Sequence, residues 1–147
     1  MTTVLVLNGP NLNMLGKRDP SQYGSTTLEE LEKHISDRAK TLGVIVKFLQ
    51  SNYEGDLVEF VQQNSSIADG IIINPAGLTI NGYSLIDACI DSKLPVLEVH
   101  LSNLGAREHW RDRSAFTRIA VGYVAGLKWK GYIAALEYFV ALTKGDI

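Results

Sequence analysis

Two groups of residues have types and spacing that suit acid-base chemistry, and the first lies near the N-terminus. Arg18 and Tyr23 are five residues apart in a segment that also contains Gly16, Pro20 and Gly24. A tyrosine beside an arginine can act as a general base, because the positive charge favours the ionised phenolate over the neutral phenol. The same residues also suit a surface loop in which Tyr23 packs and Arg18 is solvated, so the spacing leaves both interpretations open.

The second group, Glu98 and His100, ends an apolar run. Residues two apart on a strand point to the same face, so the Glu98 carboxylate can hold one imidazole nitrogen of His100. The other nitrogen could then donate a proton to a leaving group, although a histidine at a strand end can equally make one structural hydrogen bond. The following segment, 107–113, contains three arginines. It suits either a solvated, ion-paired helix face or a clamp on a substrate carboxylate or hydroxyl.

The sequence contains the elements of an α/β fold that would position these groups. Apolar runs rich in β-branched residues predict buried strands over 4–7, 44–49, 70–73 and 95–100, with a fifth over 119–124 that Gly122 interrupts. Apolar residues at helical spacing predict helices over 28–42, 56–64, 83–92 and 132–143. Thr27 and Glu30 form a possible capping box before the first of these helices, and Gly43 marks its end.

The alternation of strands and helices predicts one domain over 1–147, a doubly wound five-stranded parallel sheet with helices on both faces. In the flavodoxin-like strand order 2-1-3-4-5, the loops after strands one, three and four meet at the carboxyl edge, where ligands bind. Polar clusters begin at the ends of these strands, at Asn8, Asn74 and His100. The irregular segment 9–25 is longer than an ordinary βα loop. We therefore expect the working site at this edge.

Composition limits the partners. The 14 Lys and Arg residues against 16 Asp and Glu residues provide no excess of positive charge for nucleic acid. The sequence lacks the glycine-rich nucleotide motifs, its three histidines have no paired spacing and Cys89 is its one cysteine, so we expect neither a cofactor nor a metal. The N-terminus does not resemble a signal peptide, and no apolar run approaches the ~20 residues that span a bilayer. We expect a cytoplasmic protein that acts on a small molecule, away from membranes.

Five segments of the chain together resemble the type II 3-dehydroquinases, also called type II 3-dehydroquinate dehydratases. They are LNGPNLNMLGKRDPSQYGSTTLEEL, FLQSNYEGDLV, INPAG, LEVHLSN with AREHWR, and GYIAAL. The resemblance implies a hydro-lyase of the shikimate pathway or of quinate catabolism, which converts 3-dehydroquinate into 3-dehydroshikimate without a cofactor. It implies anti elimination of water through an enolate, and subunits that form trimers assembled into a homododecamer.

The resemblance also implies roles for individual residues. Tyr23 would remove the C2 proton, with Arg18 favouring its ionised form, and Asn11 would stabilise the enolate oxygen directly or through a water. His100, oriented by Glu98, would protonate the departing C1 hydroxyl. Substrate contacts would come from Asn74, Arg111, the backbone amides of Leu101 and Ser102, and Asp87, which would reach towards a neighbouring subunit's site.

One segment departs from the usual pattern of this family, which has Thr-His-Thr-Ser after the third strand. This chain has Thr79, Ile80, Asn81 and Gly82 there. Ile80 cannot replace the hydrogen bonds of the histidine to substrate hydroxyls, and an unpaired buried hydroxyl costs ~1–3 kcal/mol, unless Asn81 takes over. Two alternatives therefore stay open: a divergent paralogue that dehydrates a related cyclic hydroxy acid, and a weakly active protein that binds or senses such an acid.

Overall fold

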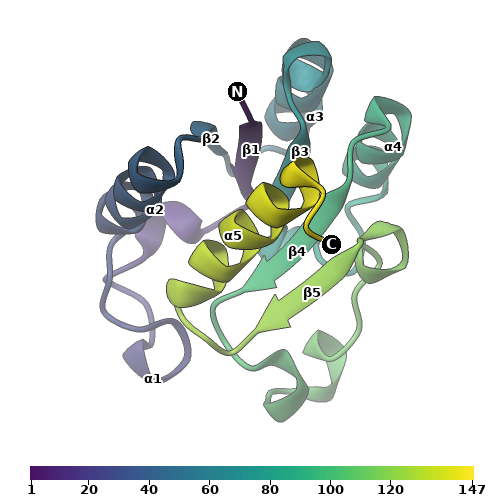
Figure 1. The fold of residues 1–147 in the computed structure, drawn as a ribbon. Helices are drawn as coiled ribbons and strands as arrows, with labels where there is room; N and C mark the ends of the chain where they lie inside the picture. Colours follow the sequence, from purple (N-terminus) through teal and green to yellow (C-terminus); the bar gives the residue numbers. More distant parts are fainter.

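The computed structural model describes all residues, 1–147, and contains five strands and five α-helices (Figure 1). The strands are β1 (Thr3–Asn8), β2 (Ile45–Gln50), β3 (Gly70–Asn74), β4 (Val96–His100) and β5 (Gly122–Ala125). The α-helices are α1 (Pro20–Tyr23), α2 (Leu28–Leu42), α3 (Glu54–Asn64), α4 (Tyr83–Ser92) and α5 (Lys130–Lys144).

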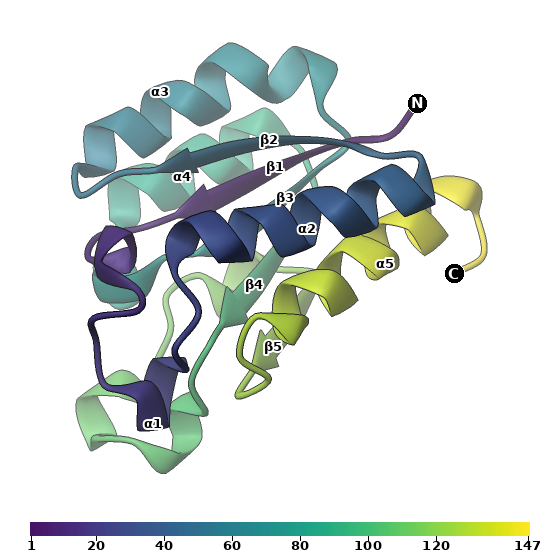
Figure 2. The ribbon, with the colours of Figure 1, turned by 90° about the vertical axis from the view of Figure 1, so that its left-hand side faces the viewer.

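The sheet has the predicted architecture. All neighbouring strands are parallel and their order is β2-β1-β3-β4-β5. Helices α2 and α5 cover one face, and α3 and α4 cover the other (Figure 2). Val4 and Val6 of β1 pack towards α2 and α5, whereas Leu5 and Leu7 pack towards the opposite helices. This alternation follows from the two-residue period of a strand, and the doubly wound, flavodoxin-like prediction is confirmed.

The helices begin and end close to the predicted positions because local signals fix their ends. Thr27 Oγ1 accepts a hydrogen bond from Glu30 N, and the Glu30 carboxylate accepts one from Thr27 N, which completes the capping box before α2. Gly43 follows the helix with φ 70°, a left-handed conformation that glycine adopts readily. Helices α3 and α5 each begin two residues before the predicted ranges. None of the helices is long and apolar enough to cross a membrane.

The fifth strand differs from the prediction over 119–124. Ile119 belongs to a short 3-10 turn, Thr117–Ile119, and β5 begins only at Gly122. The amides of Ile119 and Ala120 donate to carbonyls within that turn, so this part of the apolar run is not available to the sheet. Ile119 instead packs against the core beneath α3 and α4. An apolar run alone could not distinguish a strand from a turn that buries its side chains.

Cys89 is a structural side chain of α4. It is 1% exposed and packs among aliphatic residues of the sheet and helices. Burial raises the pKa of its thiol to about 12, because the apolar surroundings disfavour the charged thiolate. The thiol therefore stays protonated near neutral pH.

Candidate active site

A cavity of about 230 Å³ lies at the carboxyl edge of the sheet. Loops after β1, β3 and β4 form its walls, which is where the strand order predicted a site. The structure brings together eight of the residues that the sequence indicated, namely Asn11, Arg18, Tyr23, Asn74, His100, Leu101, Ser102 and Arg111. Glu98 lies directly behind His100, and Asp87 is the one residue of the predicted set that lies elsewhere.

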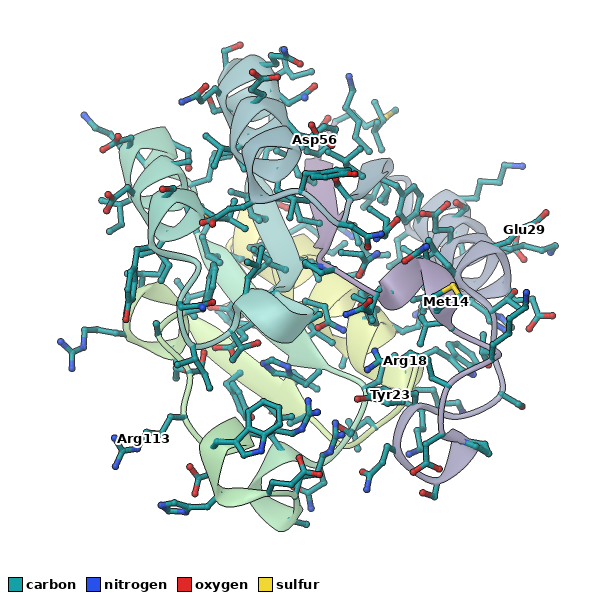
Figure 3. All side chains as sticks on the ribbon, turned by 180° about the vertical axis from the view of Figure 1, so that it is seen from behind. Met14, Arg18, Tyr23, Glu29, Asp56 and Arg113 are labelled. Atoms are coloured by element: carbon teal, nitrogen blue, oxygen red, sulfur yellow. The ribbon has the colours of Figure 1, made fainter.

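Tyr23 is the last residue of α1, a single helical turn in the irregular segment after β1 (Figure 2). The Asp19 side chain caps this turn at Ser21 N, and Pro20 starts it with a φ suited to a helix. The Tyr23 hydroxyl accepts a hydrogen bond of 2.9 Å from Arg18 Nη2, and the Arg18 guanidinium also lies 3.9 Å from the tyrosine ring centroid (Figure 3). Arg18 is thus paired with the phenol and is not a solvated surface charge.

Arg107 is a second guanidinium on the same phenol, and the sequence did not single it out. Its Nη1 donates to the Tyr23 hydroxyl at 2.9 Å and to Ser102 Oγ at 3.1 Å. Its Nε is buried and has no hydrogen-bond partner. Two charged donors thus converge on the Tyr23 oxygen, and charge-assisted hydrogen bonds of this kind are stronger than those between neutral groups. Arg107 and Tyr23 are 84 residues apart, so no local spacing could have indicated the contact.

Removing the Arg107 charge is expected to slow a reaction in which Tyr23 serves as the base that the resemblance implies. A hydrogen bond to a charged group contributes ~1.5–3 kcal/mol, so Arg107→Met should lower kcat by roughly tenfold to a hundredfold. Arg113→Met is the matched control, because Arg113 points away from the cavity and does not line it (Figure 3). Steady-state kinetics of both variants check this, and a wild-type kcat in Arg107→Met would contradict the assigned contact.

His100 and Glu98 form a buried pair on β4. His100 Nε2 lies 2.5 Å from Glu98 Oε2, and the two residues are 4% and 0% exposed. Thr117 Oγ1 donates to the other carboxylate oxygen at 2.6 Å. Burial raises the pKa of Glu98, but hydrogen bonds from His100, Thr117 and Ser114 lower it by more, so its pKa lies below the ordinary value. The carboxylate stays ionised and fixes the imidazole, leaving Nδ1 without a partner in the chain.

Thr117 was not indicated by the sequence, and its contact with Glu98 predicts a pH effect. The Thr117 hydrogen bond lowers the pKa of Glu98, so Thr117→Val should raise that pKa. Protonation of Glu98 would then release the imidazole at a higher pH. The fall of kcat on the acid side of the pH-rate profile should therefore occur at a higher pH. Thr143→Val, at the far end of α5, is the control. An acid limb that stays in place or moves to lower pH in the pH-rate profile would contradict the contact's role.

Asn11 and Asn74 are held by local contacts at the ends of β1 and β3. Asn11 has φ 71°, a left-handed conformation that asparagine tolerates better than most residues. Its backbone amide donates to Asn52 Oδ1 at 2.9 Å. The side chain of Asn11 has no hydrogen-bond partner within the chain. Asn74 Nδ2 donates to the Tyr132 hydroxyl at 3.0 Å, and Asn74 Oδ1 accepts from Ala76 N at 3.2 Å. The side-chain amide of Asn11 is therefore the one that is free to donate to a bound oxyanion.

Asp87 does not join the cavity of its own chain. It lies on the exposed side of α4. The apolar neighbours Leu85, Ile86, Ala88 and Cys89 occupy the buried side of the helix, which turns position 87 outwards. Within one subunit, the structure therefore separates Asp87 from the other predicted substrate contacts.

The loop after β3 provides an apolar wall. Ile80 lines the cavity and is 40% exposed, and Trp110 lines it from the segment after β4. The Thr79 hydroxyl donates to Ala76 O at 2.6 Å, and Asn81 does not line the cavity. Asn81 thus does not take the place of the histidine that the resemblance implies at position 80. The part of the wall that comes from the loop after β3 therefore has no free side-chain hydrogen-bond donor.

Comparison with known proteins gives a consistent result. The family described as "Dehydroquinase class II" matches residues 2–140. The chain is 48% identical over 143 residues to the 3-dehydroquinate dehydratase of Roseiflexus castenholzii, covering 97% of this chain and 90% of that protein. It is 46% identical to the 3-dehydroquinate dehydratase of Halothermothrix orenii, covering 98% and 97% respectively. A crystal structure of type II dehydroquinase from Butyrivibrio crossotus superposes with a TM-score of 0.91 at 36% identity, covering 94% of this chain and 97% of that one.

The family match covers nearly the whole chain, and the segments that carry the cavity residues all lie within it. The relatives are covered almost end to end at an identity that shows common descent. The solved structure shares the fold as well as the sequence. The chain is therefore a member of the class II dehydroquinase family.

Proposed function

We propose that the protein is a 3-dehydroquinate dehydratase, a hydro-lyase that converts 3-dehydroquinate into 3-dehydroshikimate. The observation that carries the proposal is the placement of a paired base and a paired acid on one cavity. The Tyr23 hydroxyl lies between two guanidinium groups, and His100 faces the same cavity with its carboxylate partner behind it. The named activity of the relatives supports the same assignment.

Each step of the elimination has a group in the cavity that suits it. The Tyr23 phenolate takes a proton from C2 of the substrate, and the C2 electron pair delocalises into the adjacent carbonyl as an enolate. The free amide of Asn11 can donate to that developing oxyanion directly or through a water, and such aimed donors contribute several kcal/mol. When the enolate collapses, the C1–O bond breaks and His100 gives its proton to the departing hydroxyl, which leaves as water.

The charge of the cavity suits an anionic substrate. Three arginines line it, Arg18, Arg107 and Arg111, and no aspartate or glutamate does. Arg111 Nε is already hydrogen-bonded to Glu108, and its guanidinium stacks on Trp110 at 4.0 Å, which fixes its orientation. We propose that the substrate carboxylate binds at the backbone amides of Leu101 and Ser102, and that Asn74 and Arg111 contact its hydroxyl groups. Guanidinium groups bind carboxylates and hydroxyls with defined geometry.

A direct assay tests the proposed function. Purified protein is mixed with 3-dehydroquinate, and the absorbance of the conjugated enone product is followed with and without a metal chelator. We expect the absorbance to rise at the same rate in both samples. Absence of a rise at high enzyme concentration would contradict the proposal, and ligand-induced thermal stabilisation without turnover would favour the binding-protein alternative.

We further propose that the enzyme acts in the cytoplasm as a homo-oligomer, with trimers assembled into a homododecamer. A reducing compartment suits the lone thiol of Cys89. The exposed position of Asp87 on α4 supports a contribution to a neighbouring subunit's cavity. Light scattering on the purified protein tests the assembly. A monomer at assay concentration that retains full activity would contradict it.

The apolar wall at Ile80 favours a second candidate, dehydration of a related cyclic hydroxy acid that lacks a hydroxyl on that side. Pairing an otherwise unpaired substrate hydroxyl is worth ~1–3 kcal/mol, so Ile80→His should raise kcat/KM for 3-dehydroquinate by roughly tenfold to a hundredfold. Ile80→Leu is the control that keeps the wall apolar. If the histidine variant gains nothing over the leucine variant, Ile80 does not limit recognition and the second candidate is contradicted.

A further inference from the structure

The segment that carries Arg18 and Tyr23 has few attachments to the rest of the protein. Helix α1 is four residues long and has no buried residue. Arg18 contacts Tyr23 within the segment itself. Side chains from only two other places hydrogen-bond to residues 17–24, namely Arg107 at the Tyr23 hydroxyl and Lys128 at the backbone. The Tyr23 ring also packs against the core on the α2 and α5 side of the sheet, so Arg107 and Lys128 supply the hydrogen bonds that complete the attachment of this segment.

Lys128 binds α1 at its last carbonyl groups. Its Nζ donates to Gln22 O at 2.8 Å and to Ser21 O at 3.1 Å. Carbonyls at the end of a helix have no partner within the helix, so a charged donor from another element can satisfy them. The lysine stem passes close to Gly24, the residue that ends the turn, where its Cδ would lie 3.7 Å from an added Cβ. Lys128 thus holds the backbone directly before Tyr23, and its stem passes beside the residue that follows.

The backbone of Lys128 is fixed to the strand that carries His100. Its amide donates to Leu101 O at 3.1 Å, and Gly126 N donates to His100 O at 3.3 Å. Lys128 has φ 54°, a left-handed conformation that is uncommon for a residue other than glycine. A costly backbone conformation persists where the surrounding contacts impose it, and such positions concentrate at functional sites. One residue between β5 and α5 therefore joins the end of β4 to α1.

We propose that Lys128 is a positioning residue that sets the distance between Tyr23 and His100 and holds the Tyr23 segment over the cavity. This inference depends on the proposed function. The ammonium group binds two backbone carbonyls of α1 while Arg107 binds the phenol oxygen, so loss of either contact lets the base move relative to the acid. Lys128 does not line the cavity, so it acts through the segment that it holds and not on the substrate.

Three substitutions at this position distinguish the effect of the ammonium group from the effect of the left-handed backbone. Lys128→Met keeps the stem and removes the charged donor. We expect kcat to fall by about tenfold to a hundredfold with KM changed much less, because small misplacements of a reacting group can cost on the order of 10²-fold in rate. Lys128→Arg keeps a charged donor and should recover a large part of kcat. Lys128→Gly should lose kcat like the methionine variant while its Tm is unchanged or higher, since glycine relieves the left-handed backbone.

Limited trypsinolysis gives a readout that does not depend on turnover. Lys17 and Arg18 lie in the held segment, and cleavage after them should be faster by about threefold or more in Lys128→Met, because local opening exposes the chain. Lys130→Met is the matched control, since Lys130 stacks near Trp129 and does not contact α1. Wild-type kcat together with wild-type cleavage in Lys128→Met would overturn the proposal. If the wild-type protein fails to turn over 3-dehydroquinate, the proposed function is wrong, while the cleavage rates still test the attachment.

Discussion

Tyr23→Phe is expected to lower kcat for 3-dehydroquinate by about 10²-fold to 10⁴-fold, the range that positioned acid-base groups contribute. The substitution removes one oxygen atom and leaves the ring that stacks beneath the Arg18 guanidinium. Without that oxygen, Arg18 and Arg107 lose the acceptor on which both converge, and no other side chain on the cavity accepts from two guanidinium groups. Steady-state kinetics with the enone absorbance check the result.

Two controls make the Tyr23 prediction specific. Tyr53→Phe removes the same atom from a tyrosine that is 74% exposed and does not line the cavity, so its kcat should match the wild type. In the Tyr23→Phe background, Arg107→Met should cause little further loss, because both changes remove one function and such effects are not additive. A loss that multiplies in the double variant would show that Arg107 acts independently of Tyr23.

His100→Asn is expected to lower kcat for dehydration by a similar factor, about 10²-fold to 10⁴-fold, because it removes the proposed acid. The Glu98 carboxylate would lose its imidazole partner, so Glu98→Gln should be measured beside it. The glutamine keeps the shape but not the charge that fixes the imidazole, and its loss of kcat should be smaller. His109→Asn is the control, because the His109 side chain is 88% exposed and pairs with Asp112 at the surface.

A different pattern would contradict the assignment of His100. If His100→Asn kept a wild-type kcat, another group would have to protonate the leaving hydroxyl. If Glu98→Gln lost more activity than His100→Asn, the carboxylate itself would be the acid. That outcome conflicts with a pKa for Glu98 below its ordinary value and with complete burial behind the imidazole.

Much of the fold could be predicted because its signals are local. Apolar runs indicated β1 to β4, and the capping box at Thr27 with Gly43 gave the limits of α2. The positions of Glu98 and His100 on one strand face followed from the two-residue period of a strand, and the structure places them in contact. The parallel order of the strands followed from their alternation with helices.

The contacts that complete the site could not be predicted because they join distant parts of the chain. Arg107 meets Tyr23, Thr117 meets Glu98, and Lys128 meets Gln22 across 84, 19 and 106 residues respectively. Each pair joins segments that are far apart in the chain and that the fold brings together in space. The sequence supplied suitable residue types, but it did not say which of the arginines in 107–113 would turn towards the phenol.

Hydrogen exchange at C2 separates proton removal from loss of water. 3-Dehydroquinate is incubated in D₂O with each variant, and deuterium at C2 of the remaining substrate is measured by mass spectrometry. His100→Asn retains Tyr23, so it should exchange the C2 hydrogen faster than it forms product, whereas Tyr23→Phe should do neither above background. Exchange by Tyr23→Phe as fast as by His100→Asn would contradict the assignment of Tyr23 as the base and His100 as the acid.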